Sequence, residues 1–194
     1  MESDSELWEA VRAGDRAAFG ALFERHARTI YNYCFRRVGS WSAAEDLVSV
    51  VFLEAWRRRD VDLPEGMVLP WLYGVATNVA RNASRSQRRY QLALRRLPPP
   101  QPTPDFSSEA AARLDDEAQM EGVLALIGRL RAAEQDVFWL CGWSELSYED
   151  AATAHGVPEG TVRSRLSRAR ARLRELGVEL GHEESDALEL EQKS

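Results

Sequence analysis

Arginine is concentrated in two segments of the chain that contain no acidic residue. Residues 81–96 hold six arginines, and residues 161–174 hold six more. Guanidinium groups bind phosphate oxygens and base edges, so both segments are candidates for contact with nucleic acid. The net charge of −6 does not exclude this, because the acidity is concentrated in residues 98–118 and 182–194. Local clusters of basic residues decide the affinity for phosphate, because the electrostatic potential is screened beyond ~10 Å at 0.1 M salt.

The second arginine segment follows the pattern of a helix-turn-helix. A capping motif at residues 147–150 opens a short helix, which ends at Gly156. A second helix is predicted from Thr161 to about Leu176. At 100° per residue its apolar side chains form one stripe, and the opposite face carries Arg163, Ser164, Ser167 and Arg168. An ordinary amphipathic helix is the weaker interpretation, because small and basic residues on an acid-free face suit a helix that enters the major groove.

The first arginine segment overlaps a predicted helix that runs from Pro70 to about Tyr90. The helix is expected to start at Pro70 because proline is favoured at the first helical position. One face of this helix is apolar, and the opposite face carries Asn78, Arg81, Arg85 and Arg88, with Tyr73 and Thr77 at its edge. An aromatic ring at such an edge can stack on an unpaired base, which is worth ~1–3 kcal/mol. A solvated helix face is the alternative, but solvated faces usually mix charges of both signs.

A third helix is predicted from Ser42, at the start of a capping box, to about Arg59. About half of its circumference is apolar, as expected of a core face. Val50 and Leu53 fall on the opposite side, beside Asp46 and Arg57. Two interpretations remain open: these residues form a docking surface for another protein, or a neighbouring helix covers them.

The elements that carry these segments are all helical, so the fold class is all-α with two small helical domains. Helix is expected over residues 5–38 with a break at Gly14, and residues 60–69 form a loop. Five prolines in seven positions (98–104) make an extended linker, after which helix resumes near Glu109. The predicted parts are a first domain (1–97), an acidic linker (98–116), a second domain (117–181) and an acidic tail (182–194).

Cysteine and histidine do not form a reactive or metal-binding cluster in the sequence. Cys34 and Cys141 are far apart and belong to no CxxC pair, and the three histidines do not accompany them. A redox-sensing pair of thiols is possible in principle, but two buried apolar cysteines fit better. No catalytic triad or phosphate loop is present, so we expect no catalysis and no cofactor or metal. Without an apolar signal or membrane-length run, the chain is expected to be cytoplasmic.

Three segments together resemble the extracytoplasmic-function sigma factors, of the sigma-70 family of bacterial RNA polymerase subunits. The sequence AEDLV (44–48) followed by FLEAW (52–56) is similar to the family's polymerase-docking helix. PWLY (70–73), followed by Asn78, Asn82 and Arg85, resembles the segment that reads the −10 element. VPEGTVRSRL (157–166) resembles the −35 recognition helix closely. One departure is Ser49 and Val50, where the family usually has a pair such as Gln-Glu.

The resemblance implies that residues 1–97 are sigma domain 2 and that residues 117–181 are sigma domain 4, a helix-turn-helix. The first would dock on the clamp of the largest subunit of core RNA polymerase through Asp46, Leu47, Val50 and Leu53. It would read the −10 element of promoter DNA through Tyr73, Asn78, Arg81, Asn82, Arg85 and Arg88. The second would read the −35 element through Tyr148, Glu149, Thr161, Arg163, Ser164, Ser167 and Arg168. Members of the family are often held inactive by an anti-sigma factor, which is therefore a further expected partner.

Two other functions are compatible with parts of the sequence. A free-standing helix-turn-helix regulator would explain the second domain, but it leaves the arginine and asparagine face of the first domain without a role. Such regulators usually dimerise, and no heptad repeat is present. A protein that only binds other proteins is the third option, and it would require that the second domain not bind DNA.

Overall fold

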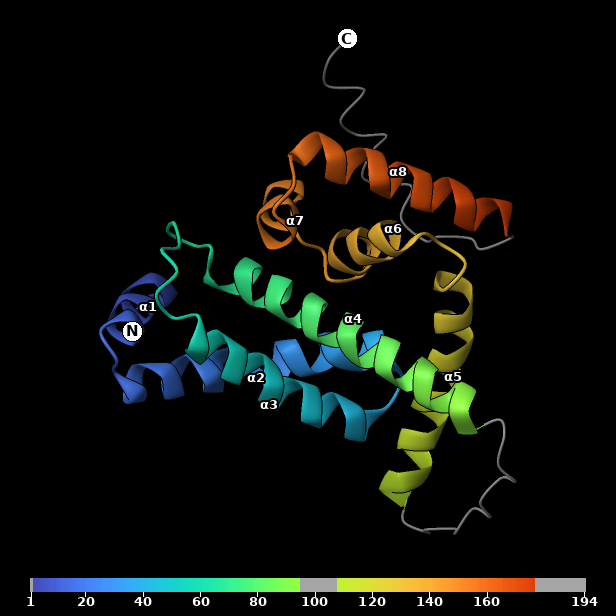
Figure 1. The fold of residues 1–194 in the computed structure, drawn as a ribbon, viewed down its shortest axis with the longest axis horizontal. Helices are drawn as coiled ribbons and strands as arrows, with labels where there is room; N and C mark the ends of the chain where they lie inside the picture. Colours follow the sequence, from blue (N-terminus) through green and yellow to red (C-terminus); the bar gives the residue numbers. More distant parts are fainter. Residues whose placement is uncertain (1, 95–107, 177–194) are drawn as a thin grey trace.

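The structure is a computed structural model that describes residues 2–94 and 108–176, with side chains described for 2–85 and 115–176. Helices are the only regular elements of these residues (Figure 1), which confirms the all-α class. They are α1 (Asp4–Arg12), α2 (Arg16–Val38), α3 (Trp41–Arg57), α4 (Val68–Leu94), α5 (Ser108–Ile127), α6 (Ala132–Val137), the π-helical η1 (Phe138–Trp143), α7 (Tyr148–His155) and α8 (Glu159–Glu175). The proline-rich run lies outside the described residues.

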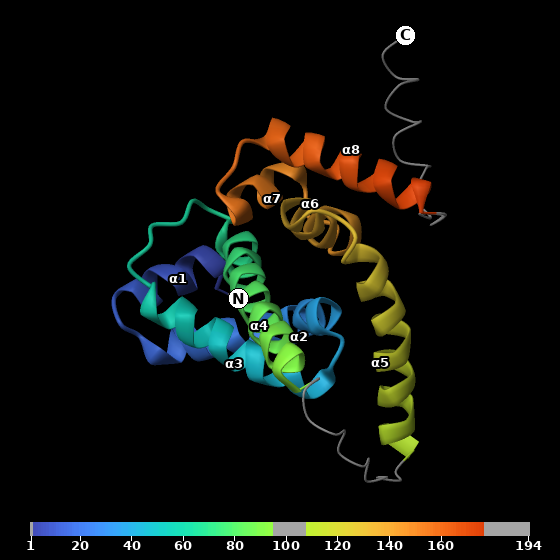
Figure 2. The same cartoon turned by 45° about the vertical axis from the view of Figure 1, so that its right-hand side comes forward.

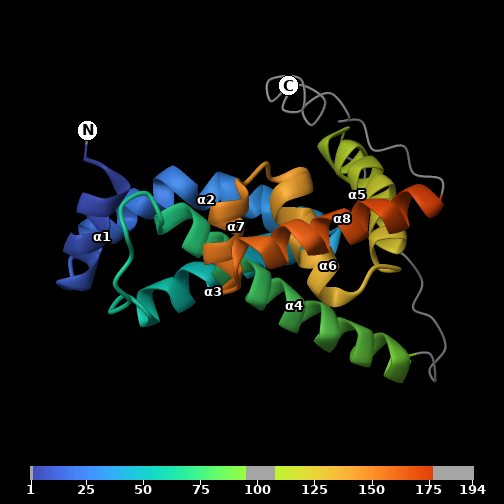
Figure 3. The same ribbon diagram turned by 90° about the horizontal axis from the view of Figure 1, so that it is seen from above.

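Helices α1 to α4 form a bundle around one apolar core. Helices α2, α3 and α4 each pack against the other two, and α1 lies across one end of them (Figures 1 and 3). The expected break between the first two helices is present. Gly14 adopts φ +93°, a conformation that glycine tolerates best, and the Asp15 carboxylate accepts hydrogen bonds from the first backbone amides of α2.

Three helices begin earlier in the structure than the sequence predicts. Helix α3 begins at Trp41 and is capped by Ser40, not by the capping box at Ser42. The reason lies in Gly39, which ends α2 in the left-handed conformation and leaves Ser40 extended, ready to cap. Helix α4 begins two residues before Pro70, and α8 begins at Glu159. Pro70 is accommodated because the first helical turn needs no backbone N–H.

A buried chain of hydroxyl groups joins α2 to α4. Thr77 donates a hydrogen bond to the backbone carbonyl of Tyr73 at 2.8 Å, and the Tyr33 hydroxyl lies 2.7 Å from the Thr77 oxygen. Since the Thr77 proton is already committed, Tyr33 is the donor of the second bond. Burial raises the pKa of Tyr33 to about 12, so this hydroxyl stays protonated in the folded protein.

Replacing Thr77 with valine should destabilise the protein by about 1–3 kcal/mol, because the buried Tyr33 hydroxyl would lose its acceptor. Urea unfolding followed by circular dichroism measures this change. Tyr33→Phe in the Thr77→Val background supplies the control: the double variant should be more stable than Thr77→Val alone, since no unpaired hydroxyl remains. If Thr77→Val unfolds at the wild-type urea concentration, the hydrogen bond does not contribute to stability.

The second half of the chain places α6 and η1 at its centre. Five consecutive residues, 136–140, are buried, because α6 and η1 lie between α8 on one side and the first bundle on the other. In η1 the helix widens by one residue per turn, and the Ser144 amide donates to the carbonyl of Trp139, five residues back, at 3.1 Å. Helix α7 ends at Gly156, which adopts φ +62°, as the sequence predicts for this C-cap.

Helix α5 begins at Ser108, in agreement with the expectation that helix resumes near Glu109. Residues 108–116, which the sequence analysis included in the linker, are therefore helical, consistent with the alanine run that follows the last proline. The middle of α5 contacts the first bundle: the Glu117 carboxylate accepts a hydrogen bond from the Trp41 amide at 2.8 Å.

The two halves pack directly against each other through α4 and α7 (Figures 1 and 2). A Cβ atom built at Gly74 of α4 would overlap the backbone carbonyl oxygen of Ala154 in α7, so only glycine permits this approach. The structure is thus a closed form, in which α6 and α7 cover part of α4 and α8 lies outermost.

Candidate nucleic-acid interface

Helix α8 buries one face and exposes a basic one. Its buried side chains are those of Val162, Leu166, Ala169 and Leu173, as the apolar stripe predicts. Arg163, Ser164, Ser167 and Arg168 are exposed. Helices α6 and α7 separate α8 from the first bundle (Figure 1), so this face opens to solvent. Small side chains between two arginines leave room for the helix to approach base edges.

The start of α8 is tied to the start of α7 by an aromatic contact. The Arg163 guanidinium lies 5.2 Å from the centre of the Tyr148 ring and 2.7 Å from the Glu159 carboxylate. Glu149 is exposed next to this pair, whereas Thr161 is half-buried. All of the residues that the sequence predicts for −35 reading therefore gather at the helix-turn-helix, with Arg168 one turn further along α8.

The predicted −10 residues of α4 divide into an open group and a covered group. Asn78, Asn82 and Arg85 are exposed, and Arg88 lies beyond the described side chains. Tyr73 is only 6% exposed, and its ring packs edge-on against that of Tyr33 at 5.1 Å. The expectation that Tyr73 stacks on a base is therefore not met in the closed form, because the two halves of the chain enclose it.

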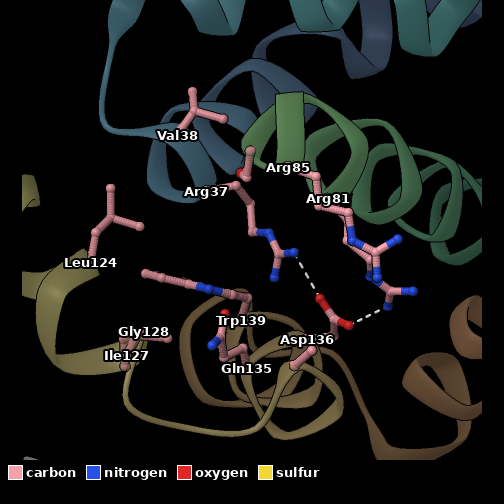
Figure 4. A pocket seen from close by; sticks show the side chains of 12 residues that line it. Arg37, Val38, Arg81, Arg85, Leu124, Ile127, Gly128, Gln135, Asp136 and Trp139 are labelled. Atoms are coloured by element: carbon pink, nitrogen blue, oxygen red, sulfur yellow. Dashed lines mark hydrogen bonds and ion pairs between the residues drawn. The ribbon is translucent and has the colours of Figure 1, made fainter. Parts of the chain in front are cut away.

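Arg81, the remaining −10 candidate, pairs with an acid of the second half. Asp136 of α6 is 1% exposed and binds two guanidinium groups, that of Arg37 at 2.7 Å and that of Arg81 (Figure 4). A carboxylate this deeply buried requires such partners, because an isolated buried charge costs several kcal/mol. A cavity of about 280 Å³ lies beside the cluster, bordered by α2, α4, α5 and α6.

His155, at the end of α7, makes the free energy of unfolding of the protein depend on pH. Burial lowers the pKa of His155, with Arg81, Arg165 and Arg37 acting in the same direction and Asp136 opposing them. The folded protein therefore favours the neutral ring. As the pH falls through about 6.5, the unfolded chain gains the proton first, so the free energy of unfolding decreases.

Urea unfolding of wild type and His155→Gln between about pH 7.5 and pH 5 measures this dependence. Carboxylates that titrate in both proteins cancel in the difference. The stability of wild type relative to the variant should fall with acidification below about pH 6.5. A difference that stays constant across the range would contradict a lowered pKa of His155 in the folded protein.

Helix α3 exposes the two apolar residues that the sequence singled out. Val50 is 43% exposed and Leu53 is 49% exposed, and Asp46 beside them is also exposed. Within the described residues no neighbouring helix covers these side chains, so that alternative interpretation is wrong. Leu47, in contrast, is buried in the bundle. It belongs to the core of the first bundle and offers no docking surface in this arrangement.

Comparison with known proteins decides the family. The Sigma-70 region 2 model matches residues 22–90, and the Sigma-70 region 4 model matches residues 120–173. RNA polymerase sigma factor CarQ of Myxococcus xanthus is 31% identical over 174 residues, which cover 89% of this chain and 96% of CarQ. ECF RNA polymerase sigma factor SigL of Mycobacterium tuberculosis is 33% identical over 174 residues, 86% of this chain and 94% of SigL.

The chain belongs to the extracytoplasmic-function group of the sigma-70 family. Solved structures agree with this. CnrH in complex with the cytosolic domain of CnrY superposes with a TM-score of 0.65 at 25% identity, covering 90% of this chain and 97% of CnrH. The sigma factor RpoE of Bartonella quintana, in complex with the anti-sigma factor NepR, superposes with a TM-score of 0.56 at 25% identity. The match covers 81% of this chain and 95% of RpoE. This sigma factor thus serves promoter-specific initiation of transcription by core RNA polymerase.

The sequence analysis did not single out three residues near the proposed binding surfaces of this sigma factor. Asp136 and Glu134 of α6 contact Arg81 and Arg168, respectively. Phe23 of α2 is a further exposed apolar residue, 41% accessible, with its ring against Phe52 at 4.8 Å. Local sequence signals do not separate any of these from ordinary surface or core positions.

The described part of this sigma factor offers no place for a metal or a reactive thiol. It contains no group of three or more His, Cys, Asp or Glu side chains arranged to bind a metal ion. Cys34 and Cys141 are free, and burial raises their pKa values to about 12 and about 11, which disfavours the thiolate. None of its described helices is long and apolar enough to cross a membrane.

Proposed function

We propose that this sigma factor reads the −35 element with the exposed face of α8. The supporting observation is the arrangement of Arg163, Ser164, Ser167 and Arg168 above a fully buried helix back. Thr161, Tyr148 and Glu149 lie at the entrance of the same helix and would contact the DNA backbone. An arginine that binds guanine in the major groove contributes about 1–3 kcal/mol of discrimination between bases.

The open part of α4 would contact the −10 element in single-stranded form. Asn78, Asn82 and Arg85 are already exposed for this role. Arg81 and Tyr73 would join them once the second half of the chain moves away, and Arg88 continues the same face in the sequence. Asparagine and arginine suit base edges and phosphates, and Tyr73 would provide a surface for base stacking.

Docking on the clamp of core RNA polymerase is assigned to Asp46, Val50 and Leu53 on α3. Exposed apolar side chains beside an acid are the composition of a protein interface rather than of a solvated surface. Leu47 contributes by holding α3 in the bundle. The domain assignment stays as the sequence predicts, with residues 1–97 for polymerase and −10 contacts and 117–181 for −35 contacts.

We further propose that the protein works in the cytoplasm, without catalysing a reaction itself, and that an anti-sigma factor regulates it. RpoE, which resembles this chain in structure, was solved in complex with the anti-sigma factor NepR, which supports this class of partner.

Mixing the full chain with bacterial core RNA polymerase tests the proposal. Co-elution in size-exclusion chromatography, followed by run-off transcription that depends on both promoter elements, is the expected outcome. Binding to duplex DNA without binding to core polymerase would instead support a free-standing regulator.

A further inference from the structure

A buried acid lies directly behind the proposed −35 recognition face. Glu134 of α6 is 7% exposed, and its Oε1 lies 3.4 Å from Nε of Arg168 in α8. Helix α6 packs against α8 (Figure 2), so this carboxylate reaches the arginine from within the second half of the chain. The Arg168 side chain itself is 57% exposed. The arginine is therefore held at the nitrogen nearest its backbone while it stays open to solvent.

The nitrogen that Glu134 contacts decides which donors of Arg168 are left for DNA. A guanidinium presents five N–H donors in a rigid planar fork, and guanine is read in the major groove by two donors at once, on O6 and N7. No other described residue forms an ion pair or hydrogen bond with the Arg168 side chain. The contact at Nε thus leaves both terminal nitrogens, Nη1 and Nη2, for a base.

Arg163, the other arginine of this face, is paired differently. Its partner Glu159 contacts the terminal Nη2 at 2.7 Å and is exposed one turn earlier on the same helix. Exposed pairs of this kind contribute little to stability, and this one occupies a nitrogen that a base would need. Of the two arginines, Arg168 is therefore the one that the fold orients in advance.

Glu134 is itself fixed by a second contact. Its Oε2 accepts a hydrogen bond from the backbone amide of Arg131 at 3.2 Å, at the N-terminus of α6. One carboxylate oxygen thus caps α6, and the other faces Arg168. Because the cap restrains the acid, the acid can restrain the guanidinium.

We propose that Glu134 is a positioning residue for −35 recognition, which holds Arg168 in the orientation that reads a guanine. This inference rests on the proposed function, because it assumes that Arg168 contacts the −35 element. A long side chain that is ordered before binding loses less conformational entropy on the DNA. The same acid repels phosphates, so it lowers affinity for DNA of any sequence while it favours the correct one.

Glu134→Gln removes the charge and keeps the cap. Glutamine is also found at this position of capping boxes, so its amide oxygen can still accept from the Arg131 amide. The variant therefore loses the ion pair with Arg168 and should keep α6, which circular dichroism checks. Glu121→Gln is the matched control, because Glu121 is exposed on α5, outside the helix-turn-helix.

The measurement compares the affinities of the full chain, bound to core polymerase, for promoters with an intact and with a scrambled −35 element. The ratio of these affinities should fall about tenfold for Glu134→Gln, which is the order of discrimination that one bidentate contact to guanine supplies. It should keep its wild-type value for Glu121→Gln. Affinity for the scrambled promoter should not fall, because the substitution removes an acid. If Glu134 only repelled phosphates, both promoters would be bound more tightly and the ratio would not change.

Arg168→Ala separates positioning from a general effect on the helix-turn-helix. In that background Glu134→Gln should no longer change the ratio, because the residue that it orients is absent. The inference is overturned if Glu134→Gln alone keeps the wild-type ratio, or if it lowers the ratio equally with and without Arg168.

Arg168→Ala alone tests the proposed function. An unchanged ratio would remove Arg168 from the −35 contacts, and the proposed role of Glu134 would fall with it. A reduced ratio for Arg168→Ala, together with a wild-type ratio for Glu134→Gln, would overturn the role of Glu134 and leave the proposed function standing.

Discussion

A chain that carries Val50→Asp together with Leu53→Asp will no longer co-elute with core RNA polymerase. Both side chains are exposed on α3, so the substitutions should leave the bundle folded. Burying an apolar anchor at the centre of an interface contributes about 2 kcal/mol or more. Two aspartates would remove both anchors and add desolvation of charge, which corresponds to at least about a hundredfold loss of affinity.

Titration of labelled protein with core polymerase measures the loss, and circular dichroism checks that the variant keeps its helices. Val61→Asp is the matched control, because Val61 is 38% exposed but lies in the loop after α3. It changes the same residue type and charge away from the proposed surface and should bind like wild type. Equal binding by the double variant and the control would assign docking to another surface, for which exposed Phe23 is the next candidate.

The second large effect is expected at α8. Removing both Arg163 and Arg168 by substitution with alanine should weaken the binding of the polymerase complex to a promoter by about a hundredfold. The estimate follows from about 1–3 kcal/mol for each arginine that binds a base edge. Neither side chain belongs to the core of the helix-turn-helix, since both are exposed, so α8 should remain folded.

The effect of this substitution should depend on the −35 sequence. On a promoter with a scrambled −35 element, wild type and the arginine variant should bind equally, because the specific contacts are already absent. Arg129→Ala controls for the loss of charge, since Arg129 is exposed but lies outside α8. A variant that loses affinity equally on intact and scrambled promoters would show that these arginines contact only phosphates.

The sequence predicts the helices and the recognition face because their signals are local. Caps, glycines and apolar periodicity lie within a few residues of the elements that they define, as at Gly14, Ser147 and Gly156. Errors of one to four residues occur at helix ends, for example where a neighbouring element decides the boundary. Ser40 caps α3 only because Gly39 has already ended α2.

The closed form could not be predicted in this way, since it depends on residues far apart in the chain. Arg37 and Asp136 are separated by 99 positions, and neither is distinguished by its sequence neighbours. The same holds for Tyr73, which lies at the edge of a basic face by periodicity but is buried and packs against Tyr33 of α2 in three dimensions. Periodicity assigns a residue to a face, whereas the partner of that face is set by tertiary packing.

The widened turn of η1 constrains how this part of the chain can change in length. Deleting one residue from Phe138–Trp143 would convert its five-residue hydrogen-bonding spacing to the ordinary four. Because six π-helical residues turn the chain about as far as five α-helical residues, the segments on either side of this deletion would keep nearly the same orientation. A deletion from the regular helix α6 would instead rotate everything after it by about 100° around the helix axis. Because residues 136–140 are buried, that rotation would move α7 off Gly74 and turn α8 relative to the first bundle. We therefore expect a single deletion to be tolerated in η1 and excluded from α6.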